Sequence, residues 1–320
     1  MKNKNGVMSV KAIIEKITEQ IQEGIYPGAS LALYRKGQWS EHYLGLADPE
    51  KGESVVADLV YDLASVSKVV GVATICAFLY AKGELELDRP FKELYPRFAH
   101  EKTTIRELLT HTSGLDPFIP NRDQLDARQL KTALENLQLK EDKSFHYTDV
   151  NFLLLGFWLE DRFHHPLDRL FEELIFTPWK MTETRFGPVE KAVPTVRGVA
   201  SGSVHDPKAR VLGCHAGSAG LFSTVADLER FLEHYLKDDF ARDLSQNFAR
   251  EEGKTRALGW NLEGDWLDHT GYTGTFIMYN RKRQEAVIFL SNRTYEKDER
   301  AQWILDRNSL MDLIKQECEK

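Results

Sequence analysis

The segment "YDLASVSKVV", residues 61–70, sets Lys68 three residues after Ser65 in an otherwise apolar stretch. Lysine is costly to bury, so its place in this stretch needs a reason. The apolar run over residues 64–82 predicts a helix that begins near Ser65, and residues three apart share a helix face. The Lys68 amine can then reach the Ser65 hydroxyl and help to activate a serine that is otherwise a poor nucleophile. The pattern predicts a catalytic serine; in the alternative interpretation, Ser65 caps the helix and Lys68 extends to water.

Two later segments carry further candidate chemistry. In "FHYTDVNFLLLG", residues 145–156, Tyr147 and Asp149 precede a long apolar helix. A tyrosine near a lysine cation can release and accept a proton more readily. In "HTGYTGT", residues 269–275, small residues let a substrate approach a strand edge, and His269 offers a titratable donor. Each segment also has a structural interpretation, the first as a helix N-terminus and the second as a bent strand with a surface histidine.

The composition limits the classes of function. The chain has 320 residues, 42% of them hydrophobic and 28% charged, which is typical of a globular protein with a sizeable core. Its net charge of −7 gives no electrostatic signature for nucleic acid or for an anionic membrane. We therefore expect a small-molecule or short-peptide substrate, no nucleic acid partner and no cofactor. The sequence leaves the oligomeric state open.

Cysteine use and apolar stretches bear on compartment and metal binding. Three scattered cysteines, Cys76, Cys214 and Cys318, suggest neither a disulfide framework nor a zinc site, so no metal is expected. The longest uncharged apolar stretch, residues 69–80, is too short to span a bilayer. The N-terminal residues 1–24 lack the apolar core of a signal peptide. The sequence therefore predicts a cytoplasmic protein.

Strand patterns lie at both ends of the chain and helical patterns in its middle. Residues 29–48 are predicted as two strands around the turn Lys36-Gly37. Three strand-like segments follow at residues 257–264, 269–280 and 285–293, the last two joined as a hairpin. Helical patterns cover residues 1–24, 64–82, 103–115, 128–137, 150–174, 223–236 and 299–318.

Capping signals fix the ends of two of these helices. Thr104 and Glu107, and likewise Thr224 and Asp227, have the spacing of a capping box. Gly114 suits a left-handed helix stop. Both helices are therefore predicted to begin directly after a threonine.

The simplest assembly of these elements is an α+β fold. The strands from the two ends pair into one antiparallel sheet, flanked by the N- and C-terminal helices, with an inserted all-helical lobe. We expect a single domain over residues 1–320. Its α/β lobe covers about residues 1–60 and 221–320, and its helical lobe about residues 61–220. The functional site is expected in the cleft between the lobes.

Taken in order, the three motifs resemble the serine β-lactamase and penicillin-binding-protein superfamily. The resemblance is to the branch with class C β-lactamases, DD-peptidases and related esterases, whose pattern is Ser-x-x-Lys, Tyr-x-Asn and then Lys- or His-Thr-Gly. The segments "YPGASLALYRKGQ", "LLTHTSGL", "GSVHDPKA" and "AGLFSTVADLERF" are also similar to family segments. The resemblance covers about residues 10–310 and implies the β-lactamase/transpeptidase-like fold.

The resemblance also implies the roles of single residues. Ser65 would attack a carbonyl group and form an acyl-enzyme, while Lys68 and Tyr147 handle the protons. The backbone N–H groups of Ser65 and Tyr272 would form the oxyanion hole. Substrate-binding positions would be Asp149, His269, Thr270, Gly271 and Tyr272.

Two departures from the family pattern bear on the substrate. Asp149 replaces a neutral amide with a carboxylate, and His269 stands where a permanent cation is common. Both changes favour an esterase or peptidase with a less anionic substrate, and leave a weak β-lactamase activity open. Asp149 also invites an alternative, in which a protein of the same fold binds ligand or penicillin but is catalytically impaired.

Overall fold

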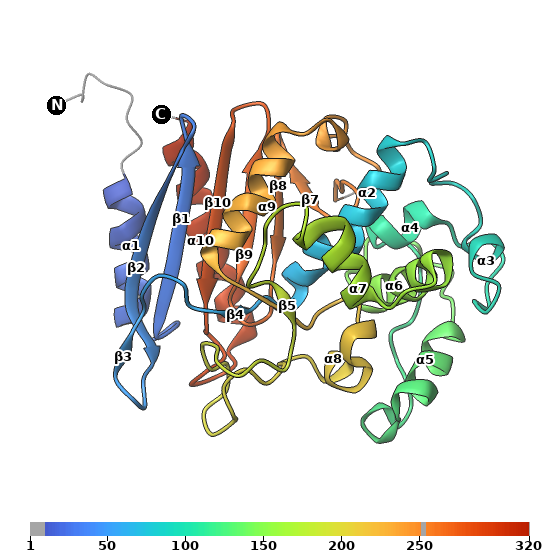
Figure 1. Cartoon of the computed structure of the whole chain (residues 1–320), viewed down its shortest axis with the longest axis horizontal. Helices are drawn as coiled ribbons and strands as arrows, with labels where there is room; N and C mark the ends of the chain where they lie inside the picture. Colours follow the sequence, from blue (N-terminus) through green and yellow to red (C-terminus); the bar gives the residue numbers. More distant parts are fainter. Residues whose placement is uncertain (1–9, 251–253, 320) are drawn as a thin grey trace.

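The computed structural model describes residues 10–250 and 254–319, and in this part of the chain the main sheet is antiparallel and has seven strands (Figure 1). Its strand order is β3-β2-β1-β10-β9-β8-β7, so strands from the two ends of the chain meet in the centre. Leu31 of β1 pairs with Phe289 of β10 at this junction. The predicted α+β fold is confirmed. The strands are β1 Gly28–Arg35, β2 Gln38–Asp48, β3 Glu53–Ser54, β7 Asn261–Glu263, β8 Trp266–Thr270, β9 Phe276–Asn280 and β10 Glu285–Ser291.

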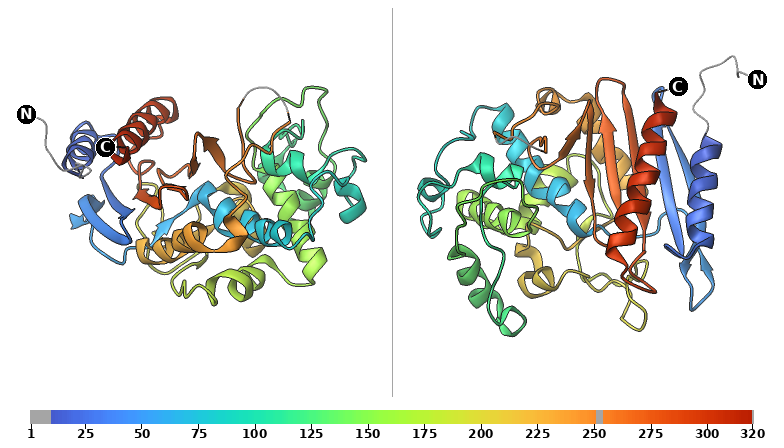
Figure 2. Two further views of the ribbon diagram at one scale, coloured as in Figure 1. Left: turned by 90° about the horizontal axis from the view of Figure 1, so that it is seen from above. Right: turned by 180° about the vertical axis from the view of Figure 1, so that it is seen from behind.

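Two terminal helices cover one face of the sheet. Helices α1 (Val10–Gln22) and α10 (Arg300–Cys318) lie side by side outside the central strands (Figure 2). Their apolar side chains pack with Leu31 of β1 and Phe289 of β10. Alternate strand residues, such as Ala32, point to the opposite face and join the larger core. The central strands are therefore buried on both faces, as their apolar sequences require. The N-terminal residues 1–9 of the first predicted helix lie outside the described residues.

The remaining helices fill the other side of the molecule. Helix α9 packs on the second face of the sheet, and the other helices form the region at the right of Figure 1. They are α2 Thr74–Ala81, α3 Phe91–Leu94, α4 Ile105–Thr110, α5 Ala127–Glu135, α6 Val150–Phe163, α7 Leu167–Phe171, α8 Pro207–Leu212 and α9 Val225–Lys237. A small second sheet, which the sequence did not predict, joins β4 Tyr61–Asp62, β6 Leu221–Ser223 and β5 Arg185–Phe186.

The helix that carries Lys68 is built from three kinds of turn. A 3₁₀ turn over Ala64–Val66 leads into a π-helical segment over Val69–Ala73 and then into α2. The segment Ala64–Ala81 is long and apolar enough to cross a membrane by length and composition, but 78% of it is buried inside the fold. Its apolar character is therefore that of a core helix.

Two predicted helices have other bounds in the structure. The helix predicted over residues 150–174 ends at Phe163, because His164 is left-handed (φ 57°) and Pro166 cannot continue the hydrogen-bond ladder. The helix predicted to stop at Gly114 ends at Thr110, where His111 already takes the left-handed conformation. The Thr104–Glu107 capping box that begins this helix is present as predicted.

One predicted strand is in fact two. Residues 269–280 divide into the end of β8 and the whole of β9, with a turn at residues 271–275 between them. His269 therefore lies near the end of a strand and does not open one. The hairpin between β9 and β10 is confirmed.

Candidate active site

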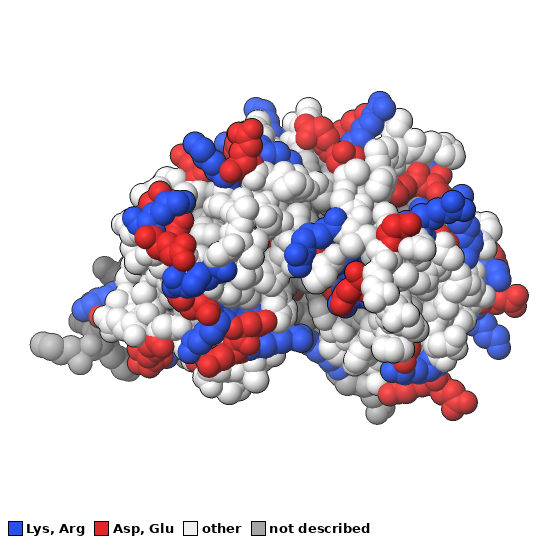
Figure 3. Space-filling view, turned by 90° about the horizontal axis from the view of Figure 1, so that it is seen from below, with Lys and Arg blue, Asp and Glu red and all other residues white. Residues whose placement is uncertain are grey.

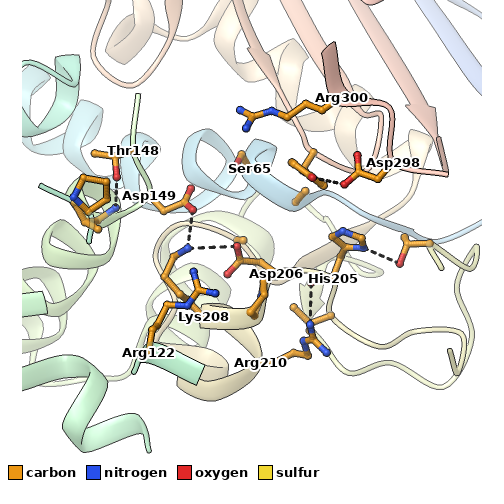
Figure 4. Close-up of a pocket in the computed structure, with 18 of the residues that line it drawn as sticks. Ser65, Arg122, Thr148, Asp149, His205, Asp206, Lys208, Arg210, Asp298 and Arg300 are labelled. Carbon is orange, nitrogen blue, oxygen red and sulfur yellow. Dashed lines mark hydrogen bonds and ion pairs between the residues drawn. The ribbon is translucent and has the colours of Figure 1, made fainter. Parts of the chain in front are cut away.

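A cavity of about 910 Å³ opens beside the start of the core helix (Figure 4). Four of the predicted site residues line it, namely Ser65, Tyr147, Asp149 and Tyr272. The rest of its wall includes Arg122, His205, Lys208 and Arg300. Basic and acidic side chains are interspersed on the face shown in Figure 3, without an extended area of one sign.

The backbone before Ser65 is held in an unusual conformation. Ala64 has φ +45°, a left-handed value that residues with a Cβ rarely adopt. Its N–H donates to Asp62 Oδ1 over 2.8 Å, and the other Asp62 oxygen accepts from the backbone N–H of His205. Burial raises the pKa of Asp62 to about 6. These contacts fix the direction in which Ser65 enters the cavity.

The turn after β8 is tied to the same backbone. Thr273 Oγ1 donates to the Asp62 carbonyl over 2.8 Å, and Thr275 Oγ1 donates to the Leu63 carbonyl over 3.0 Å. A Cβ at Gly271 would come within 2.6 Å of the Leu63 carbonyl, so only glycine lets the turn lie this close. Gly271 thus positions the turn, while its neighbour Tyr272 is the residue that reaches the cavity.

Lys68 is fully buried directly behind Ser65. Its ammonium donates to Ser65 Oγ over 2.8 Å, to Asp149 Oδ1 over 2.7 Å and to the Ser218 carbonyl over 3.0 Å. All three N–H bonds therefore have acceptors, which explains why the charge can be buried. Burial opposes the charged form, but Asp149 and Tyr147 outweigh it and raise the pKa of Lys68 above its ordinary value. The interpretation in which Lys68 extends to water is wrong.

Tyr147 completes the group around the serine. Lys68 Nζ lies 5.2 Å from the centroid of the Tyr147 ring. The ring also packs against His111, with centroids 4.6 Å apart, and faces His269 at 6.1 Å. Tyr147 is 37% exposed and lines the cavity. The structure thus brings a hydroxyl, an amine and a phenol together, although they come from segments about 80 residues apart.

Asp149 stands at the N-cap position of α6 but does not cap the helix with its side chain. Its Oδ1 accepts from Lys68, and its Oδ2 lies 3.0 Å from Nζ of Lys208. Burial favours the neutral acid, but Lys68 and Lys208 outweigh it and hold the pKa of Asp149 well below its usual range. Asp149 is therefore a carboxylate shared by two lysines.

Neither buried histidine near Tyr147 supplies a permanent cation. Burial, with Lys68 and Arg256 nearby, lowers the pKa of His269 well below its ordinary value, and burial does the same for His111. His111 Nδ1 accepts from the Thr148 backbone N–H and lies 3.2 Å from the Asn151 amide. The surface interpretation of His269 is wrong, because the side chain is buried inside the fold.

Sequence reasoning missed two cations near these residues. Lys208 lies in the segment "GSVHDPKA", and nothing in its spacing links it to Asp149. Arg256 is almost fully buried, donates to the Gly259 carbonyl over 3.2 Å, and has its pKa lowered to about 10 by burial. Because Arg256 ends a polar stretch that includes Lys254 and Thr255, nothing in the sequence marks it as a buried residue.

The cavity and its surroundings offer no obvious metal centre. No group of three or more His, Cys, Asp or Glu side chains that could hold a metal ion occurs in residues 10–250 and 254–319. His205 instead packs its ring on Tyr272, at 5.5 Å, and His215 pairs with Glu160. These histidines therefore have structural partners of their own.

Comparisons with known proteins identify the family and the fold. The model of the family described as Beta-lactamase matches residues 13–310. A relative from Escherichia coli (strain K12), named "Putative D-alanyl-D-alanine carboxypeptidase", is 27% identical, over 87% of this chain and 81% of its own.

Solved structures share the fold. The β-lactamase/D-alanine carboxypeptidase from Pseudomonas syringae has a TM-score of 0.75 at 20% identity, covering 94% of this chain and 98% of its own. The hydrolase EstCE1, with promiscuous acyltransferase activity, has a TM-score of 0.76 at 18% identity, covering 95% and 98%. With the family model matching nearly the whole sequence, the chain belongs to the Beta-lactamase family.

Proposed function

We propose that the protein is a serine hydrolase that forms an acyl-enzyme at Ser65 from a small ester or amide. The observation that carries the proposal is the 2.8 Å contact between Lys68 Nζ and Ser65 Oγ, with Tyr147 beside the same ammonium. A cavity of about 910 Å³ is of the size that holds a small-molecule substrate. The family membership supports the same class of reaction.

In the acylation step, Ser65 Oγ attacks the carbonyl carbon of the substrate. Lys68 is already protonated in the resting site. It can therefore accept the Ser65 proton only while it passes one of its own protons to another group. Tyr147 faces both Lys68 and the cavity, and we assign it the transfer of that proton to the leaving oxygen or nitrogen. The bond to the leaving group breaks as the acyl–serine ester forms.

In the second step, water attacks the acyl–serine ester and its proton returns to Ser65 through the same two groups. Negative charge develops on the carbonyl oxygen in both steps. The backbone N–H groups of Ser65 and Tyr272 are the proposed donors to this oxygen, since both residues line the cavity. The Tyr272 carbonyl accepts from Arg293 Nε over 2.9 Å, which helps to fix this peptide segment.

The neutral His269 and the carboxylate of Asp149 support an esterase or peptidase with a less anionic substrate over an efficient β-lactamase. The relatives' names point to D-alanyl peptides and EstCE1 to esters, so both classes are candidates for this chain. A second candidate is a protein that is acylated but releases no product. The carboxylate at position 149, held by two lysines, is the observation that favours it.

Intact-mass spectrometry after treatment with a fluorophosphonate tests the proposal. We expect one adduct on the wild-type protein and none on Ser65→Ala. No adduct on the folded wild type, or an undiminished adduct on Ser65→Ala, would overturn it.

Steady-state rates then separate the candidate substrates. A p-nitrophenyl ester, a D-alanyl peptide and a chromogenic cephalosporin cover the three classes. Turnover of the ester or the peptide supports a hydrolase, whereas one equivalent of acylation without further product release supports the second candidate.

A further inference from the structure

Lys208 lies in the first turn of α8, and Figure 4 shows its side chain directed at Asp149. Asp206 caps this helix by accepting from the Ala209 backbone N–H over 2.8 Å, and Pro207 sets the first helical residue. The Lys208 side chain is only 13% exposed, and its ammonium lies 3.0 Å from Asp149 Oδ2 and 3.9 Å from Asp206 Oδ2. The ammonium is therefore held at one place in the cavity wall.

Lys208, Asp149 and Lys68 form two consecutive ion pairs, and Lys68 in turn contacts Oγ of Ser65. Each oxygen of Asp149 binds a different lysine, Oδ1 to Lys68 and Oδ2 to Lys208. A carboxylate engaged at both oxygens cannot rotate without breaking an ion pair, so Lys208 fixes the oxygen that meets Lys68. With Asp206, whose Oδ2 lies 3.9 Å from the Lys208 ammonium, the group holds two ammonium groups and two carboxylates.

We propose that Lys208 is a positioning residue for the acylation of Ser65: it orients and ionises Asp149, which in turn orients Lys68. This inference rests on the proposed function and adds a residue to it. Lys208 acts through Asp149, so its effect on the reaction requires the carboxylate. That dependence distinguishes it from an ion pair that only stabilises the fold.

A double-mutant cycle measures the dependence. The readout is the second-order rate constant for labelling of Ser65 by a fluorophosphonate, which needs no knowledge of the natural substrate. We expect Lys208→Met to slow labelling about 10- to 100-fold, since small displacements of a catalytic group have effects of this order. In the Asp149→Asn background the same change should alter the rate less than about twofold, because no carboxylate remains to be held.

The pH profile of labelling gives a second readout, which a purely structural role would not move. Removing Lys208 takes away one of the two cations that keep Asp149 ionised, so the acid limb of the profile should move to higher pH. Asp149→Asn should lack this limb. The other titratable groups around Lys68, Asp149 and Lys208 are Tyr147, His111, His269 and Asp206. Neither variant replaces any of them.

Two further variants complete the design. Lys51→Met removes the lysine of a Lys–Asp pair of 2.8 Å that lies outside the cavity, and should leave the labelling rate unchanged. Lys208→Arg keeps the charge and should retain most of the rate and the wild-type acid limb. If Lys208→Met does not fold, Lys208→Gln, which also removes the charge but keeps a polar side chain, replaces it in the cycle.

The outcomes separate this inference from the proposed function. Wild-type labelling at Ser65 with an unchanged rate and acid limb in Lys208→Met would overturn the role of Lys208 alone. An equal loss of rate with and without the Asp149 carboxylate would overturn it as well, and so would an acid limb displaced by Lys208→Arg. Absence of any Ser65 adduct in the wild type would overturn the proposed function instead.

Discussion

The imidazole of His111 lies against the phenol ring of Tyr147, with ring centroids 4.6 Å apart and planes inclined by 38°. His111 is the left-handed residue that ends α4, and Tyr147 stands two residues before the N-cap residue Asp149 of α6. The ends of two helices thus place the phenol beside Lys68. The proposed proton transfer at Ser65 would depend on this packing as well as on the chemistry of the three groups.

Replacing Lys68 by methionine should abolish the activation of Ser65. The methionine side chain fills about the same space as the alkyl chain of Lys68, but Ser65 Oγ loses the ammonium that contacts it. The rate of fluorophosphonate labelling should therefore fall by about 10²- to 10⁴-fold. The exposed Lys82, at the end of the same helix, provides the control Lys82→Met. Labelling of folded Lys68→Met at the wild-type rate would contradict the account.

The Tyr147 hydroxyl can be tested separately from its ring. Tyr147→Phe keeps the packing on His111, so the melting temperature should change little, while kcat for a p-nitrophenyl ester falls by about 10²- to 10⁴-fold. Tyr80→Phe, at a tyrosine that packs on Phe248 away from the cavity, is the matched control. Equal losses in both variants would argue against a role for the Tyr147 phenol.

The two buried histidines make stability depend on pH. Their pKa values are lowered in the folded chain, so the unfolded chain binds more protons once the pH falls below about 6.5. Their contribution to the free energy of unfolding is complete above that pH. It is lost on acidification, by up to about 1.4 kcal/mol per pH unit for each histidine.

Urea unfolding between pH 7.5 and 5.5 measures this slope. His269→Gln should reduce the slope, because one of the two groups no longer takes up a proton on unfolding. A slope that is the same in wild type and His269→Gln would show that His269 is not held neutral.

Gly271 tests the contact between the turn after β8 and the segment before Ser65. A Cβ at this position would lie 2.1 Å from Thr275 Oγ1 and 2.6 Å from the Leu63 carbonyl. Gly271→Ala should therefore displace the turn, lower the melting temperature, and reduce kcat for the ester more than it raises KM, because Tyr272 belongs to the proposed oxyanion hole. Wild-type kcat and melting temperature would show that the turn tolerates a side chain.

Much of the fold follows from local patterns in the sequence. The alternation around Lys36-Gly37 and the threonine caps at Thr104 and Thr224 predict elements that the structure contains. At Thr224 only half of the predicted capping box forms, because the Asp227 carboxylate accepts instead from the Glu183 backbone and from Thr184. A tertiary partner that is distant in sequence decides this detail.

In the candidate site, too, some contacts follow from local spacing in the sequence and others do not. The spacing of Ser65 and Lys68 on one helix predicts their contact, since three residues make about one turn. The ion pair between Asp149 and Lys208 joins the starts of helices α6 and α8, 59 positions apart, and no periodicity relates them. Trp260 packs among Tyr235, Tyr279 and Phe231 in the core.

The most direct measurement of the central claim is to trap the acyl group on the protein during turnover. Wild-type protein is mixed with p-nitrophenyl acetate, quenched in acid, digested and mapped by mass spectrometry. The account predicts an acetyl group on the peptide that carries Ser65, formed within one turnover and lost when the substrate is exhausted. Turnover without acetylation of that peptide, or acetylation that persists unchanged in Ser65→Ala, would contradict it.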